Sequence, residues 1–248
     1  MLHIQVPSRL VRGLAVHHIW FAPRPVASDA LRFAQYFHCG HRAEVPGFRR
    51  SPKFTLLVDL GPDAQALLHS FTPTTRYEVN RADRDGLRLE IEQDAGAYRG
   101  FLNAASATKG RGQVDAASVA PYWPHLRVTK AVAGGETLVM HAHLVDPQSA
   151  RVLLYQSASL FRLEAGSQAR NRIARANRWL HFRDMLMFRD QGLRVYDFGG
   201  IVPGTGDAEA RGINEFKQGF GGAVAEQSNY VSHVNVLWNR LRGGTGAT

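Results

Sequence analysis

The chain has 248 residues, of which 44% are hydrophobic and 21% are charged, a composition that is typical of globular proteins and excludes fibrous and intrinsically disordered classes. Lys and Arg outnumber Asp and Glu, and the formal net charge is +9. We therefore expect a polyanionic partner such as tRNA, coenzyme A, a nucleotide-linked sugar or an anionic membrane face, although charge alone does not choose among them.

No apolar run approaches the ~20 residues that a membrane-spanning helix needs, and the N-terminal residues lack the apolar core of a signal peptide. We therefore predict a cytoplasmic protein. The single cysteine, Cys39, excludes an intrachain disulfide. His38 and His41 flank it, but adjacent side chains diverge and no second Cys pair accompanies them, so no metal site is predicted there.

The first 60 residues give weak signals. Residues 28–37 place apolar side chains on one face at helical spacing and predict a helix. Residues 42–53 contain two prolines and several cations and predict a turn-rich connection. Residues 54–60 are mainly apolar or β-branched and predict a strand.

Two helices are predicted next, over residues 63–71 and 74–85, and the second ends at Gly86. Arg76 and Arg81 lie on the broad polar face of the second helix, where several cations suit contacts with phosphate. The alternative is a solvated face that neighbouring acidic residues partly neutralise.

From residue 87 onward the elements follow a regular order. We predict strands over 87–91, 128–132, 137–145, 151–161, 193–198 and 229–236. We predict helices over 94–108, 113–126 (broken by prolines), 167–189 and 213–218. This order predicts an α/β fold with an α+β mixed sheet, followed by a frayed end.

Two motifs resemble one known family. The sequences GLRVYDFGG (192–200) and INEFKQGFG (213–221) resemble the end of the catalytic domain of FemABX-type transferases, a branch of the GNAT acyltransferase superfamily. The sequence TRYEVNRADRDG (75–86) resembles the Arg-x-x-Ile-x-x-Ala-x-x-x-Gly helix of the same family. The motifs occur in the family's order, and the resemblance covers roughly residues 55–235.

The resemblance implies a GNAT-like fold in three parts. These are a shortened N-terminal subdomain (1–86), a complete catalytic domain (87–235) and a C-terminal tail (236–248). In that fold two neighbouring parallel strands part and bind the acyl donor between them. The corresponding residues here are Ser157 and Ser159 on one strand and Tyr196, Asp197 and Gly199 on or just after the other.

The same resemblance assigns catalysis to the short helix 213–218. Lys217 would stabilise the transition state, and the carbonyl of Phe216 would position the attacking amine. Arg76 and Arg81 would contact acceptor phosphates. Independently of the resemblance, a lysine between Phe216 and Phe220 and beside glycines can be partly desolvated and can meet developing negative charge. The alternative is an exposed lysine on a short amphipathic helix.

The donor is less well defined. Acyl-CoA-dependent GNAT enzymes have a Gln/Arg-x-x-Gly-x-Gly/Ala loop that binds pyrophosphate. The nearest match, residues 171–176, lacks glycine, which weakens the case for coenzyme A. Arg172 and Arg175 would still suit another anionic donor, including a tRNA acceptor end. His141 and His143 alternate on one face of a strand, where they would serve as a general base or have only a structural role.

We therefore predict an N-acyltransferase that moves an aminoacyl group, or another activated acyl group, to the amine of a small or nucleotide-linked acceptor. No tightly bound cofactor or metal is expected, and the co-substrate is aminoacyl-tRNA or an acyl thioester. One alternative is a thioester-dependent acyltransferase of polysaccharide or natural-product assembly. Another is a non-catalytic GNAT-like module that binds RNA or a partner protein. The sequence leaves the oligomeric state open.

Overall fold

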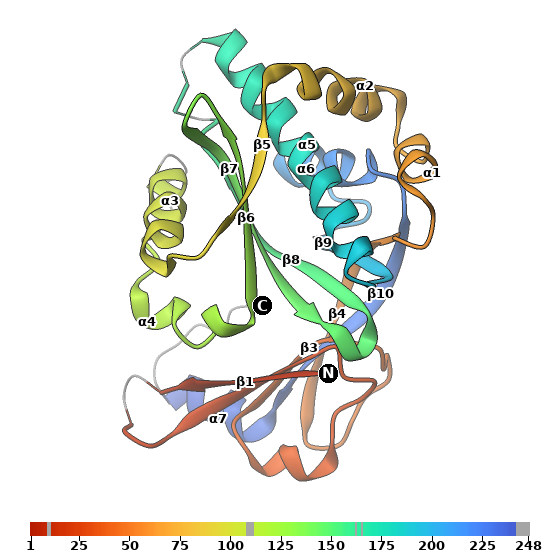
Figure 1. The fold of residues 1–248 in the computed structure, drawn as a ribbon. Coiled ribbons are helices and arrows are strands. Elements are labelled where there is room, and N and C mark those ends of the chain that lie inside the picture. Colours follow the sequence, from red (N-terminus) through yellow and green to blue (C-terminus); the bar gives the residue numbers. More distant parts are fainter. Residues whose placement is uncertain (9–10, 108–111, 162, 165, 242–248) are drawn as a thin grey trace. The chain divides into compact units, whose positions relative to one another are not determined.

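The computed structural model describes residues 1–8, 11–107, 112–161, 163–164 and 166–241. These residues contain ten β-strands and seven α-helices (Figure 1). They fall into two compact units: a smaller one of Met1–Thr55, Gly200–Pro203 and Val224–Thr248, and a larger one of Leu56–Gly199 and Gly204–Ala223. Neither unit ends at residue 86, and the domain division at that residue stays a prediction.

The smaller unit contains β1 (Leu2–Pro7), β2 (Ala15–Trp20), β3 (Ala34–Cys39), most of β10 (Ala223–Ser232) and α7 (His233–Leu241). The strands are hydrogen-bonded in the order β1-β2-β3-β10. The β2–β3 pair is parallel, and the other two pairs are antiparallel. Ile19, Tyr36, Phe48 and Tyr230 are among the buried residues of its core.

The helix predicted over residues 28–37 is wrong. A short 3₁₀ helix, Ala27–Leu31, is followed directly by strand β3. Burial in the strand alternates at its start, because Ala34 and Tyr36 are buried whereas Gln35 between them is only half-buried. Pairing with β2 and β10 satisfies the backbone of this segment, and this tertiary pairing overrides the helical spacing of its apolar residues.

Two other boundaries are also wrong. The predicted connection over 42–53 is a strand from Phe48 onward, since β4 spans Phe48–Asp59. The last predicted strand ends at Ser232, whose hydroxyl accepts a hydrogen bond from the N–H of Asn235 (3.2 Å) and so caps α7. Part of the expected tail is therefore helical, and residues 242–248 lie outside the described residues.

The larger unit contains the C-terminal part of β4 and five strands whose bounds are close to those predicted. They are β5 (Arg88–Glu92), β6 (Leu126–Ala133), β7 (Glu136–Asp146), β8 (Arg151–Ser159) and β9 (Val195–Ile201). The hydrogen-bonded order is β4-β9-β8-β7-β6-β5. Strands β5 to β8 pair antiparallel, whereas β8 and β9 pair parallel. The α/β mixed-sheet, GNAT-like fold is thereby confirmed.

The predicted helices of this unit are also present. They are α1 (Ala64–His69), α2 (Pro73–Ala82), α3 (Ala95–Ala107), α4 (Ala116–Val119), α5 (Ser167–Asp190) and α6 (Ala208–Gln218). The carboxylate of Asp63 caps α1 by accepting the N–H of Ala66 at 2.8 Å. Helix α6 begins earlier than predicted, because Asp207 caps it by accepting the N–H of Ala210 at 2.7 Å. No helix in the described residues is long and apolar enough to cross a membrane.

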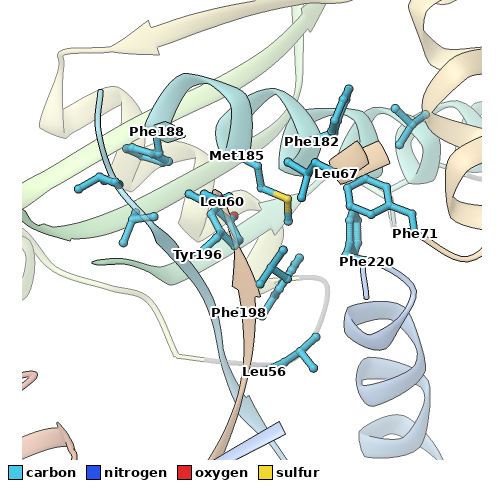
Figure 2. Packing of buried hydrophobic residues seen from close by; sticks show 14 residues of the cluster. Leu56, Leu60, Leu67, Phe71, Phe182, Met185, Phe188, Tyr196, Phe198 and Phe220 are labelled. Carbon is cyan, nitrogen blue, oxygen red and sulfur yellow. The ribbon is translucent and has the colours of Figure 1, made fainter. Parts of the chain in front are cut away.

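The sheet of the larger unit has α5 on one face and α3 with α4 on the other (Figure 1). Beneath α5, Phe182, Met185 and Phe188 pack against Tyr196 and Phe198 of β9, and all five are buried (Figure 2). Beneath α3 and α4 lies a second buried cluster that contains Tyr98, Leu102, Val119, Met140, Ala142 and Ala158. The two faces therefore offer separate environments within one unit.

Candidate active site

Strands β8 and β9 run side by side over only three residue pairs. The last recorded pair joins Leu153 to Asp197. Further along β8, Ser157 lies opposite His141 of β7 and is exposed, and Ser159 lies opposite Val139. The predicted placement of Ser157 and Tyr196 on adjacent parallel strands is thus confirmed.

Asp197 fixes the backbone at the point where the two strands part. Its carboxylate is fully buried, forms an ion pair with Arg151 and accepts the N–H of Gly199 at 2.8 Å. Gly199 has φ +71°, a conformation that favours glycine. A charge-assisted contact and a left-handed turn therefore hold the chain directly after Asp197.

Lys217 lies in the last turn of α6 and is half-buried. Burial lowers the pKa of its ammonium, and the nearby carboxylate of Asp197 opposes that shift. The turn itself is anchored, because the carbonyl of Gly219 accepts the N–H of Thr72 at 2.9 Å, and a Cβ at Gly219 would come within 2.5 Å of the hydroxyl of Thr75. The ammonium is therefore held within the electrostatic influence of Asp197.

Phe216 packs between His181 and Arg178 of α5. Its ring lies 5.7 Å from the ring of His181, and the guanidinium carbon of Arg178 lies 5.0 Å from its centroid. Burial lowers the pKa of Arg178, while Glu78 opposes the shift. This cation–π contact and the ring contact fix the residue before Lys217.

A buried polar network lies under α5. The side chains of His141, His143, His181, Asp184 and Tyr196 are each at most 1% exposed. The Asp184 carboxylate lies 2.7 Å from His141 Nδ1 and 3.5 Å from His143 Nε2. The Tyr196 hydroxyl lies 3.1 Å from His143 Nε2 and 3.0 Å from His181 Nδ1. The five side chains thus connect β7, α5 and β9 through one set of polar contacts.

The protonation of this network follows from its geometry. Burial lowers the pKa of His143 to about 4, although Asp184 opposes the shift, and burial lowers the pKa of His181 well below its usual value. Both rings are therefore neutral near pH 7. Burial also raises the pKa of Tyr196, so its hydroxyl keeps its single proton. That hydroxyl donates to one of the two imidazoles and accepts from the other.

His141 differs from the other two histidines. Its Nδ1 faces the Asp184 carboxylate, and its Nε2 lies 2.8 Å from the side-chain oxygen of Asn177. His141 thus links the Asp184 carboxylate to Asn177, and both partners lie on α5.

Neither His141 nor His143 is exposed, and each ring nitrogen already has a hydrogen-bond partner. A direct general-base role for these residues stays a prediction. What the arrangement does is to hold Tyr196 and His181 in place. The ring of His181 in turn lies 4.9 Å from Phe198 and 5.2 Å from Phe220.

His141, His181 and Asp184 offer ligand atoms within 4.8 Å of one another and could hold a metal ion. Zinc would need its ligands about 2.0–2.2 Å away in a tetrahedral arrangement. Here the rings of His141 and His181 are tilted by 30° with centroids 4.0 Å apart, and Asp184 already contacts His141 Nδ1 at 2.7 Å. The placement suits a hydrogen-bonded network, and a metal ion would have to replace several of these contacts.

The predicted arginines lie apart from this network. Arg76 donates to the carbonyl of His69 (3.2 Å), and the exposed Arg81 donates to the hydroxyl of Tyr77 (3.4 Å). Both lie on α2. Their role in binding the acceptor stays a prediction.

Arg175 and Arg172 both lie on α5. Arg175 is 9% exposed and donates from Nε to Asp85 at 2.9 Å, so it braces α5 against the turn that follows α2. Arg172 is half-buried. The assignment of either residue to the donor stays a prediction.

The sequence reasoning missed Asn177, Arg178, His181 and Asp184 of α5, and also Arg151. A signal was present for three of them. Asn177, His181 and Asp184 stand at i, i+4 and i+7, which places them on one face of the helix. That face is otherwise apolar, and buried polar residues at such positions indicate a network that needs partners.

Comparisons with known proteins agree on the fold. No protein-family model matches the chain, and no curated protein sequence matches it. Among solved structures, FemX is similar with a TM-score of 0.65 at 12% identity, over 96% of this chain and 85% of FemX.

Lysylphosphatidylglycerol synthetase is similar in two further structures, both with TM-scores of 0.52. The C-terminal domain of a putative enzyme from Agrobacterium fabrum is 16% identical, over 88% of this chain and 73% of that one. L-PGS from Bacillus licheniformis is 15% identical, over 87% of this chain and 74% of that one. At such low identity these likenesses establish a shared fold, and the resemblance to FemABX-type proteins is confirmed at that level.

Proposed function

We propose that this protein is an N-acyltransferase that moves an aminoacyl group from aminoacyl-tRNA to the amine of a small acceptor. The observation that carries the proposal is the position of Lys217. Its partly buried ammonium interacts electrostatically with the carboxylate of Asp197. Asp197 belongs to the last residue pair between the parallel strands β8 and β9. A preorganised cation beside parted strands suits a reaction in which a carbonyl oxygen becomes negative.

The reaction joins the acceptor nitrogen to the acyl carbonyl carbon. The bond from that carbon to the ester oxygen breaks, and the proton released by the amine passes to the departing oxygen. In the tetrahedral intermediate the former carbonyl oxygen carries a full negative charge. The role of Lys217 is to meet this charge, and the role of Phe216 is to orient the amine with its backbone carbonyl.

Two observations favour an aminoacyl ester of tRNA over an acyl-CoA. Residues 171–176, the nearest match to a pyrophosphate-binding loop, lie inside α5, which begins at Ser167. Their N–H groups are therefore committed to hydrogen bonds within the helix. The net charge of +9 suits either donor, because both are polyanions. The names FemX and lysylphosphatidylglycerol synthetase belong to proteins of the same fold, and the second name describes attachment of a lysyl group.

The test offers the purified protein a mixed pool of charged tRNAs and, separately, a panel of acyl-CoA thioesters, each with candidate amines. Deacylation of one tRNA species that depends on an added amine is the expected result. Deacylation of a thioester alone would assign the protein to the thioester-dependent transferases. If no donor is consumed while labelled tRNA still binds, the protein is a non-catalytic RNA-binding module.

A further inference from the structure

The face of the sheet opposite α5 carries a cavity of about 260 Å³ that the proposed chemistry does not use. Tyrosine and glutamine side chains dominate its lining, notably Tyr98, Tyr122, Tyr155 and Gln156. The remaining lining residues are Gln113, Val114, Ser118, Val119 and Leu126. Among the residues that the structure describes, the lining of this cavity thus contains no charged side chain.

A bulge in β8 builds this wall. In the register with β7, Leu154 lies opposite His143 and Gln156 lies opposite Ala142, so Tyr155 is an extra residue. A bulge of this kind lets two consecutive side chains point to one face of the sheet. Tyr155 stacks on Tyr122 with ring centroids 5.1 Å apart, and Gln156 bonds to Tyr98, so both residues of the bulge face α3 and α4.

The position of the bulge links the cavity to the reaction. It begins two residues after Leu153, where the recorded pairing of β8 with β9 ends. The cavity therefore lies beside the place where the strands part, on the face opposite the network of His141 and Asp184. A ligand group held against Tyr155 and Gln156 would be adjacent to the reacting centre that the proposed function places between the strands.

Fixed hydrogen bonds hold the polar groups of the cavity. The Tyr98 hydroxyl donates to the side-chain oxygen of Gln156 at 2.6 Å, which leaves the amide N–H₂ group of Gln156 as a donor. Burial raises the pKa of Tyr98, Tyr122 and Tyr155, so their hydroxyls stay uncharged in the physiological range. A charged ligand group would lose its hydration here, and the described lining side chains themselves carry no charge to pair with it.

We propose that this tyrosine-lined cavity binds an uncharged, ring-bearing group of the acceptor amine, and so selects against acceptors that carry a second charge. The inference rests on the proposed function, because it takes the acceptor nitrogen to lie where β8 and β9 part. Contacts with the rings of Tyr122 and Tyr155, which line the cavity, supply attraction for a ligand ring, and the Gln156 amide supplies a hydrogen bond.

The test compares four primary amines with the donor fixed: tyramine (a neutral phenol ring), butylamine (no ring), 4-aminobutyrate (a carboxylate) and putrescine (a second ammonium). We expect kcat/KM for tyramine to exceed that for either charged amine at least ~30-fold, in the range expected when a charged group is left unpaired in a binding site. Tyr122→Ala should raise KM for tyramine ~10-fold and change kcat/KM for butylamine less than ~3-fold, since butylamine has no ring to contact Tyr122.

A second variant, which introduces a charge, distinguishes a change of specificity from a loss of folding. Gln156→Glu places a carboxylate in the cavity and should raise kcat/KM for putrescine while lowering it for tyramine, a gain that a misfolded variant cannot give. Equal losses for all four amines in both variants would overturn the inference, and so would a wild-type protein that accepts the four amines equally.

Calorimetric titration with tyramine in the absence of donor separates the two proposals. If tyramine binds the wild type but not Tyr122→Ala, and no amine receives an acyl group, the cavity is a ring-binding site and the proposed transferase function is rejected. Transfer to all amines with no measurable binding of tyramine would retain the transferase and reject the role of the cavity.

Discussion

The two faces of the larger unit's sheet differ in how they handle charge. On the α5 face, three histidines and Asp184 are buried together, and Lys217 and Arg178 lie nearby with lowered pKa values. On the α3 and α4 face, the described residues that line the cavity are all uncharged. Strand β8 contributes to both environments, since Leu154 packs beneath α5 whereas Gln156 bonds to Tyr98 of α3.

This difference indicates that the two faces serve different steps, one the reaction and the other substrate recognition. Buried charges with fixed partners are suited to stabilising charge that develops during a reaction. A neutral wall with stacked rings is suited to recognising a ligand group that does not react. Substitutions on the α5 face should therefore alter rate, stability and pH dependence, whereas substitutions on the opposite face should alter the choice of substrate.

The largest effect is expected at Asp184. Asp184→Ala removes the carboxylate that faces His141 and His143 and leaves these buried ring nitrogens without that partner. We expect the free energy of unfolding to fall by about 3 kcal/mol or more, as it does when one partner of a buried pair is deleted. Urea denaturation at pH 7 measures the loss. A loss below about 1 kcal/mol would show that the network does not depend on this charge.

The second prediction concerns pH. His143 has a folded-state pKa of about 4 against an ordinary value of 6.5, so only the unfolded chain takes up a proton between these values. Stability should therefore decrease as the pH falls from 6.5 to about 4, by up to about 3 kcal/mol from this group. His181 shifts in the same direction and adds to the loss.

The pH effect can be assigned by variants on the two faces. His143→Gln removes the titrating ring and should flatten the dependence of the urea midpoint on pH between 4 and 6.5. Tyr98→Phe, on the opposite face, removes a hydroxyl that does not titrate there and should leave the slope unchanged. Equal slopes in all three proteins would assign the acid sensitivity to groups outside the network.

Lys217→Ala should lower kcat ~100-fold with little change in donor affinity, because one oxyanion contact is lost only in the transition state. Lys217→Arg should recover little, since a planar guanidinium does not replace a compact ammonium between Phe216 and Phe220. Single-turnover transfer and thermal stability are measured on the same variants. Gln218→Ala, which changes an exposed neighbour on the same helix, is the matched control. Full activity in a folded Lys217→Ala protein would remove the residue from the mechanism.

The sequence predicted the α5 face less completely than the fold around it. Elements that begin or end at clear capping or turn residues have nearly the predicted bounds. Examples are α1, which Asp63 caps, and β7, which ends at Asp146 before Pro147. The helix predicted over residues 28–37 was wrong because residues 34–39 form strand β3. This strand is stabilised by pairing with β2 and β10, and such pairing between separate segments leaves no signal in the local spacing of apolar residues.

The candidate site shows the same limit. Lys217 and Asp197 were singled out from local motifs, but their electrostatic coupling depends on how α6 packs and has no signature in either motif. His141 was noticed for its spacing on a strand, whereas its partner Asp184 lies 43 residues away. The bulge at Tyr155 depends on the register with β7, which periodicity within one strand does not reveal.

The smallest effect is expected at Arg76 and Arg81, which lie on α2 rather than on either sheet face. If they contact phosphate, Arg76→Ala and Arg81→Ala should each raise KM a few-fold with kcat unchanged, because the contact is present in the ground and transition states alike. The slope of log KM against log salt should fall by about one unit per arginine removed. Arg194→Ala, at another exposed arginine, is the control and should change neither quantity. A large fall in kcat at constant KM would instead place these arginines in the chemical step, and the charged character of the α5 face would then extend onto α2.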